Sequence, residues 1–243
     1  MNKKVTSPKT ARKASKIKKD RADYDVMLLL KIGQKEHIEA FQKEGLIYMN
    51  TFEYFREYEE SSAECRKDVF EGCSELFQPN MGTLEINGKE IKDISGPMKI
   101  TYDNSEKNNV FCMYAAKYDK NAKYSLEDLN NIIKMNPQNY EFGNYCLILQ
   151  NADEFLRRLH KSCNEKCLNF KHRLVEYVDT NKHHGEYGFF RKPLEYSYQS
   201  EFRIVIENHT GEPYKLFIGD ISDISIILET TKYNDAVKLH PKK

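Results

Sequence analysis

Residues whose side chains could do chemistry are concentrated in one short stretch near the C-terminal end of the chain. Between Tyr196 and Ile206, the amide of Gln199 precedes the carboxylate of Glu201 by two residues, and Arg203 follows two residues later. In a β-strand alternate side chains share a face, so these three polar side chains should lie together. A carboxylate can stabilise positive charge that develops during a reaction. The alternating apolar side chains, which should face a core, are Phe202, Ile204 and Ile206.

An aromatic and basic segment, residues 187–192, leads directly into this strand. Its rings, Phe189 and Phe190, could stack on an unpaired nucleobase, a contact of about 1–3 kcal/mol per base. Burial of either ring in the core is the alternative interpretation. For the strand itself, the alternative is an edge strand with an ordinary solvent-facing side.

A Gln-x-Glu strand after an aromatic loop resembles the signature of ADP-ribosyltransferases. In that superfamily the glutamate anchors the nicotinamide ribose, and the residue two positions earlier presents the acceptor. The resemblance therefore implies that Glu201 and Gln199 are catalytic, that Arg203 lies by the substrate, and that NAD⁺ donates ADP-ribose without a metal. Members with Gln-x-Glu include enzymes that modify guanine bases, which implies a nucleic-acid acceptor, with RNA favoured over DNA.

The superfamily also has typical residues on two earlier core strands. The first usually carries Arg or His, and the matching residue here is Lys31, which would pair with the pyrophosphate or ribose of NAD⁺. The second usually carries Ser-Thr-Ser or Tyr, and Tyr114 would stack on nicotinamide. Tyr54 and Arg66 are the further residues expected to contact the cofactor.

A second resemblance extends over residues 26–228. Its motifs resemble a bacterial domain family of unassigned function that is often found beside phage-defence genes. They are also similar to toxins of toxin–antitoxin–chaperone systems that ADP-ribosylate messenger RNA, which implies an antiviral effector with an antitoxin and a chaperone as partners. The segments that carry this resemblance are 45–51, 54–56, 66–72, 110–115 and 196–203.

The residues alone leave two alternative functions open, a metal-dependent nuclease and a non-catalytic binding module. Asp68 and Glu71, together with Glu201, could hold a divalent metal ion in a nuclease, although such a run is more typical of a solvated helix end. The second alternative is a non-catalytic module that binds nucleic acid or protein. A second group of possible metal ligands consists of His160, Cys163, Cys167 and His172. Cysteines and histidines at this spacing can bind zinc, but the segment has the pattern of an amphipathic helix and its end, and the helix is the favoured interpretation.

The hydrophobic pattern predicts many short strands and a few helices without an internal repeat. This is typical of a mixed α+β fold, and the resemblance implies mostly antiparallel ADP-ribosyltransferase-like sheets with flanking helices. The expected strands include 26–31, 46–49, 110–115, 145–149, 174–178 and 196–207, and the expected helices include 35–44, 125–135 and 152–168.

The net charge of +1 conceals a strong asymmetry. Residues 1–21 hold nine basic residues and one acid, or +8, and the rest of the chain carries −7. We therefore expect a mobile basic arm, residues 1–22, and one catalytic domain, residues 23–243. The arm, through residues 3–21, and the segment 187–192 would contact nucleic acid. No apolar run reaches the ~18 residues of a membrane span, so a cytoplasmic protein with reduced cysteines and no membrane partner is expected.

Deletion of residues 2–21 tests the role of the arm. If its charge contributes to nucleic-acid affinity, the truncated protein should bind RNA more weakly, with a shallower slope of log affinity against log salt concentration. Filter binding over a salt series measures both quantities. An unchanged slope would assign the arm to another partner.

Overall fold

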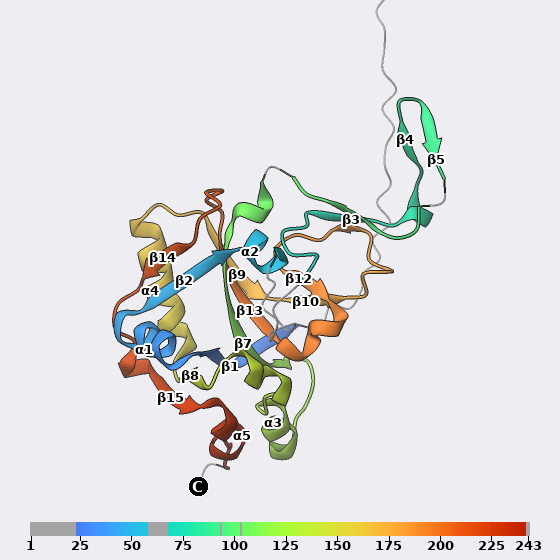
Figure 1. Ribbon diagram of the computed structural model, residues 1–243. Helices are drawn as coiled ribbons and strands as arrows, with labels where there is room; N and C mark the ends of the chain where they lie inside the picture. The colour runs from blue at the N-terminus through green and yellow to red at the C-terminus, as the bar shows by residue number, and fades with distance from the viewer. Residues whose placement is uncertain (1–22, 58–67, 93, 103, 242–243) are drawn as a thin grey trace, which may run out of the picture.

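The computed structural model describes residues 23–57, 68–92, 94–102 and 104–241. The predicted arm, Arg66 and the motif segment before Asp68 therefore lie outside the described residues. The described chain forms a mixed α+β fold, as the pattern predicted. Its main sheet has eight strands, which are paired antiparallel throughout (Figure 1). The strands are β1 (Tyr24–Gly33), β2 (Leu46–Thr51), β7 (Asn109–Asp119), β8 (Tyr145–Leu149), β9 (Phe170–Leu174), β13 (Glu201–Ile206), β14 (Tyr214–Phe217) and β15 (Ser225–Glu229).

The sheet forks at its longest strand, β7 (Figure 1). Strand β13 runs along β7 from Asn109 to Tyr114 and is itself flanked by β9. Strand β2 pairs with the first two residues of β7, whereas β1 pairs with Tyr114 to Asp119. Since β2 and β13 both pair with β7 at Asn109, they occupy its opposite edges. Strands β1 and β2 then diverge, with β8 and β15 beyond β1 and β14 beyond β2.

The two faces of the main sheet have different covers. One face packs on α1 (Lys35–Glu44) and α4 (Ala152–Glu165), and Phe41 and Phe155 from these helices meet edge to face in the largest hydrophobic cluster. On the other face, a second cluster joins β1, β7 and β8 to residues next to α3 (Leu126–Ile132) and in α5 (Tyr233–Ala236). Helix α3 begins with a capping box between Ser125 and Asp128. The remaining helix of the described chain, α2 (Phe52–Glu57), follows β2 directly.

Smaller sheets and short 3-10 segments complete the chain. Two parallel strands, β10 (Glu176–Val178) and β12 (Arg191–Pro193), lie beside β13, and β3 (Glu75–Phe77) pairs with β6 (Met98–Ile100) and β11 (Gly185–Glu186). The hairpin β4 (Leu84–Ile86) and β5 (Lys89–Ile91) projects from the body (Figure 1). The 3-10 segments are η2 (Pro79–Met81), η3 (Ser105–Lys107), η4 (Pro137–Phe142), η5 (Leu194–Gln199), η6 (Ser222–Ile224) and η7 (Thr230–Lys232).

The predicted strand 196–207 is wrong in its first part. Residues Leu194–Gln199 form the 3-10 segment η5, and Ser200 has a left-handed backbone with φ 42 before β13 begins at Glu201. The edge-strand interpretation is also wrong, since β13 is an interior strand and every one of its residues is buried. The expected strand 174–178 is split between β9 and β10. Helix α4 ends at Glu165, three residues earlier than expected.

In the described ranges, no helix combines the length and the apolar character that a bilayer crossing requires.

Gly45 ends α1 in the left-handed conformation, with φ 62, and its N–H donates to the carbonyl of Ala40. A Cβ added there would lie 2.1 Å from the Gly219 carbonyl oxygen. Gly45→Ala should therefore lower the free energy of unfolding by more than the about 1–3 kcal/mol of backbone strain alone. Urea unfolding measures the loss.

Gly88→Ala is the matched control for that substitution. Gly88 also has positive φ, at 77, but no atom lies within 4 Å of its added Cβ. The control should therefore report backbone strain without the steric clash. Equal losses in the two variants would contradict the close packing of Gly45 against Gly219.

Candidate functional site: a buried ion-pair cluster around Glu201

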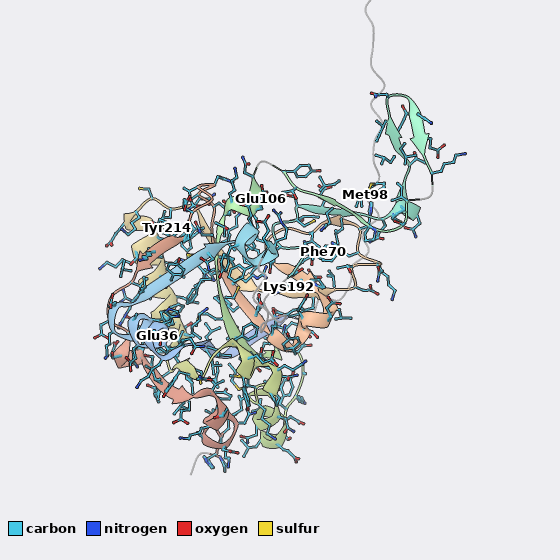
Figure 2. All side chains as sticks on the ribbon, viewed as in Figure 1. Glu36, Phe70, Met98, Glu106, Lys192 and Tyr214 are labelled. Carbon is cyan, nitrogen blue, oxygen red and sulfur yellow. The ribbon has the colours of Figure 1, made fainter. Side chains whose placement is uncertain are left out.

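Four charged side chains meet on the face of β13 that is turned away from α1 and α4. Glu201 and Arg203 alternate along β13, Lys192 comes from β12, and Glu71 comes from the turn before β3. We call Glu71, Lys192, Glu201 and Arg203 the ion-pair cluster. All four side chains are buried. Figure 2 labels Lys192 near the middle of the molecule and Phe70, the neighbour of Glu71, on the side toward β3.

The carboxylate of Glu201 is paired on both oxygens. Its Oε1 accepts a hydrogen bond from Lys192 Nζ at 3.0 Å, and its Oε2 accepts from Arg203 Nε at 2.7 Å. Burial on its own would raise the pKa of Glu201, but the charges and hydrogen bonds of Lys192 and Arg203 outweigh it and lower the pKa to about 2. Glu201 is therefore an anion at neutral pH although its side chain is only 9% exposed.

Arg203 joins three segments of the chain. Besides Glu201, its guanidinium donates from Nη2 to Glu71 Oε1 and from Nη1 to the carbonyl of Phe189 at 2.7 Å. Lys192 Nζ lies 3.5 Å from the same Glu71 oxygen. Burial lowers the pKa of Lys192 and of Arg203, yet the carboxylates of Glu71 and Glu201 more than compensate, so both pKa values are raised.

Gln199 reaches the cluster by a route that the sequence did not predict. It ends η5 rather than lying on β13, so it does not share a strand face with Glu201 as expected. Lys192 Nζ nevertheless donates to Gln199 Oε1 at 2.7 Å as well as to Glu201 Oε1. Lys192, which sequence reasoning had placed only in the basic loop, therefore connects the amide to the carboxylate.

Asp68 lies next to the cluster with one half of its carboxyl group unpaired. Its Oδ1 accepts the N–H of Phe70 at 2.9 Å, whereas its buried Oδ2 has no hydrogen-bond partner among the described residues. Burial and the repulsion of Glu71 raise the pKa of Asp68 to about 7, against the opposing attraction of Lys192 and Arg203. The hydroxyl of Tyr187 is likewise buried and unpaired in the part of the chain that the structure describes.

Tyr114 faces the same side of the sheet as Glu201 and is its direct cross-strand partner. Its ring packs in the second hydrophobic cluster, which also contains Leu30 and Ile133, and its hydroxyl donates to the carbonyl of Lys134 at 3.2 Å. Burial raises the pKa of Tyr114 to about 12. The ring is therefore near Glu201 along the strands but enclosed by apolar side chains.

Lys31 is not brought to Glu201. Its ammonium lies over the ring of Phe111, 4.1 Å from the centroid, on the opposite face of the sheet. Its Nζ donates to the carbonyl of Cys112 at 2.8 Å, at the fork where neither β1 nor β2 pairs with that residue. The physical reason is the strand alternation, which puts Lys31 on the side of Leu29 in the α1–α4 core.

The three aromatic residues predicted to contact the cofactor or the acceptor differ in their surroundings. Tyr54, on α2, is 44% exposed and meets the ring of Phe55 edge to face. Phe189 stacks on Phe52 with ring centroids 4.9 Å apart. Phe190 is buried in a cluster with Val110 and Val205, so the core interpretation is right for this ring.

In the described structure, the residues of the two metal alternatives do not come together as a ligand set. Among the described residues no three His, Cys, Asp or Glu side chains are grouped to hold a metal ion, because the carboxylates of Glu71 and Glu201 turn toward Lys192 and Arg203. Of the proposed zinc ligands, the Nε2 atoms of His160 and His172 lie 2.7 Å apart, but Cys163 is buried in the core.

Comparison with models of protein families, with curated proteins and with solved structures found no match to this chain. The ion-pair cluster and its geometry are therefore the basis for a functional assignment.

Arg203→Met tests the structural role of the cluster. Removal of the guanidinium leaves Glu71 and Glu201 buried with one cation between them, so we expect a loss of about 3–5 kcal/mol in the free energy of unfolding. Arg157→Met, which removes a 64% exposed arginine paired with Glu154, is the control and should change stability far less. Equal unfolding midpoints in urea for the two variants would contradict the pairing of Arg203.

Proposed function

We propose that the protein is an NAD⁺-dependent ADP-ribosyltransferase that modifies nucleic acid, RNA rather than DNA, with Glu201 as the catalytic carboxylate. The observation that carries the proposal is the ionised and buried Glu201 at the first residue of an interior strand, with Gln199 joined to it through Lys192. On this proposal, the antiparallel main sheet is an ADP-ribosyltransferase-like sheet.

The chemistry favours a carboxylate in this state. Cleavage of the bond between nicotinamide and ribose leaves positive charge on the ribose as it becomes an oxocarbenium ion. A fixed anion away from water stabilises that charge more than it stabilises the ground state, which is the requirement for catalysis. Because the pKa of Glu201 is lowered to about 2, its charge is present throughout the physiological pH range.

The same pairing sets a condition for NAD⁺ binding. Lys192 and Arg203 occupy both carboxylate oxygens, so the ribose hydroxyls must displace at least one of these hydrogen bonds. Lys192 is the ligand to be displaced, since its flexible stem and single ammonium move more readily than a guanidinium held at three points. The released ammonium would then pair with the pyrophosphate, one of the two roles that the resemblance implies for Lys31.

The order of the strands also supports the proposal. The resemblance assigns functional residues to two early core strands and to a late strand with the glutamate. Here Lys31, Tyr114 and Glu201 lie on β1, β7 and β13, which are consecutive neighbours in one sheet. The position of Lys31 on the opposite face is the departure from that pattern, and Tyr114 would have to leave its apolar surroundings to reach nicotinamide.

The cellular role that follows is a cytoplasmic toxin or antiviral effector. An enzyme that modifies RNA would harm its own cell, so the proposal includes an antitoxin and a chaperone as partners. The basic residues 3–21 would hold the RNA by contacts with phosphates.

Two substitutions separate the roles of the motif. Glu201→Gln should reduce nicotinamide release from NAD⁺ a hundredfold or more, because a transition-state contact of about 2.7–4 kcal/mol is lost. Gln199→Ala should abolish transfer to the acceptor and preserve NAD⁺ binding and slow hydrolysis, because Gln199 would touch only the acceptor. Labelled NAD⁺ with separate RNA, DNA and protein pools measures both activities.

Glu207→Gln is the matched control for the carboxylate. Glu207 immediately follows β13 at its far end, pairs with Lys171 and lies outside the ion-pair cluster, so its variant should retain both activities. Melting temperatures confirm folding. Full activity of a folded Glu201→Gln variant would refute the proposed function, and equal loss of both activities in the two motif variants would refute only the division of roles.

A further inference from the structure

Two buried polar atoms beside the ion-pair cluster have no partner in the described structure. They are Asp68 Oδ2 and the hydroxyl oxygen of Tyr187, and each side chain is 1% exposed. A buried polar atom without a hydrogen bond costs free energy, so native proteins keep few of them. Asp68 interacts electrostatically with Glu71, Lys192 and Arg203, and Tyr187 with Asp68 and Glu71, so a polar ligand bound beside the cluster would supply both missing bonds.

The backbone fixes Asp68 for this purpose. The N–H of Phe70 holds Oδ1 at 2.9 Å, and the N–H of Glu71 donates to the carbonyl of Asp68 at 3.1 Å. The carboxyl group is therefore anchored by one oxygen, and the other is left for a ligand.

Charged groups surround Asp68 from every side of the cluster. Glu71 comes from the same turn, Lys192 from β12 and Arg203 from β13. Asp68 also acts electrostatically on Tyr187, Tyr196 and Cys73. Lys192 is the common neighbour, because its ammonium interacts with Asp68 and hydrogen-bonds to both Gln199 and Glu201. Asp68 is therefore connected electrostatically, through Lys192, to the two residues of the Gln-x-Glu motif.

We propose that Asp68 is the general base of the transfer reaction, which accepts a proton from an N–H group of the acceptor nucleobase while Tyr187 donates a hydrogen bond to the same base. This inference rests on the proposed function and adds a catalytic residue to it. Glu201 stabilises the ribose, Gln199 orients the acceptor, and Asp68 takes up the proton that the transfer releases.

The step balances in atoms and charge. The acceptor nitrogen gives its lone pair to C1′ of the ribose as the bond from C1′ to the nicotinamide nitrogen breaks. The electron pair of that bond goes to nicotinamide, which leaves as a neutral molecule. The acceptor nitrogen then loses its proton to the Asp68 carboxylate, which becomes a neutral carboxyl group and later releases the proton to solvent.

Burial and Glu71 raise the pKa of Asp68 to about 7, which suits this role. A general base works best when its pKa is near the pH at which it operates, since it then combines basicity with a useful fraction of the deprotonated form. Only the deprotonated form accepts a proton. The transfer rate should therefore rise with pH up to about 7 and level off above it.

The test compares wild type, Asp68→Asn and Tyr187→Phe in labelled transfer from NAD⁺ to RNA between pH 5 and pH 9. Asp68→Asn keeps an oxygen for the Phe70 N–H, so it should fold; it should lose about 10²–10⁴-fold in kcat and lose the rise with pH. Tyr187→Phe should raise the KM for RNA about 2- to 12-fold, the value of one hydrogen bond. Asp153→Asn, on the exposed first turn of α4, is the control and should behave as wild type.

A second measurement needs no activity. Carboxyl NMR of isotope-labelled aspartate, with the Asp68 signal identified by its absence from Asp68→Asn, should show titration near pH 7. Titration near pH 4, or a folded Asp68→Asn variant with wild-type transfer and pH profile, would overturn the role of Asp68 and leave the proposed function intact. If wild-type protein releases no nicotinamide with any RNA, DNA or protein pool, both proposals fall.

Discussion

The pairing of Arg203 inside the protein is the interaction on which the rest of the site depends. Its guanidinium connects β13 to the turn before β3 and to the backbone of Phe189. Removal of two cations and two carboxylates from water is repaid only when each charge has good hydrogen-bond partners. The segments that carry these partners are far apart in sequence, so the cluster forms only when the whole fold is complete.

That dependence also places the proposed catalytic carboxylate, Glu201, in a defined electrostatic state. An isolated buried glutamate would be protonated, since burial penalises the anion. Lys192 and Arg203 reverse the outcome for Glu201 and lower its pKa. For Asp68, burial and the repulsion of Glu71 outweigh the same two cations, so its pKa is raised. A single buried cluster thus holds one carboxyl group as a permanent anion and another that can exchange a proton near neutral pH. This separation of two carboxyl groups by their surroundings is typical of sites that perform acid–base work.

Local pattern was sufficient for part of the structure. The apolar alternation of Phe202, Ile204 and Ile206 predicted the core face of β13, and it is confirmed because strand alternation is a local property. The positions of Gln199 and Lys31 were wrong because each depends on long-range pairing: a left-handed Ser200 ends a 3-10 segment, and the fork in the sheet leaves the Cys112 carbonyl for Lys31. Lys192 was missed as a site residue because β12 has only three residues, too few for a pattern to show. Its partners became visible only with the tertiary structure.

Because Ser200 has a left-handed backbone, the site is formed where η5 meets β13 and not by β13 alone. With φ 42 at that residue, the chain turns between Gln199 and Glu201, and the Ser200 hydroxyl donates to the carbonyl of Ala115 on the neighbouring strand. Transplantation of the six residues of β13 into another sheet would carry over Glu201 and Arg203 but leave the amide behind. A designer who wished to move this arrangement to a new scaffold would have to copy η5, Ser200 and the facing part of β7 as one unit.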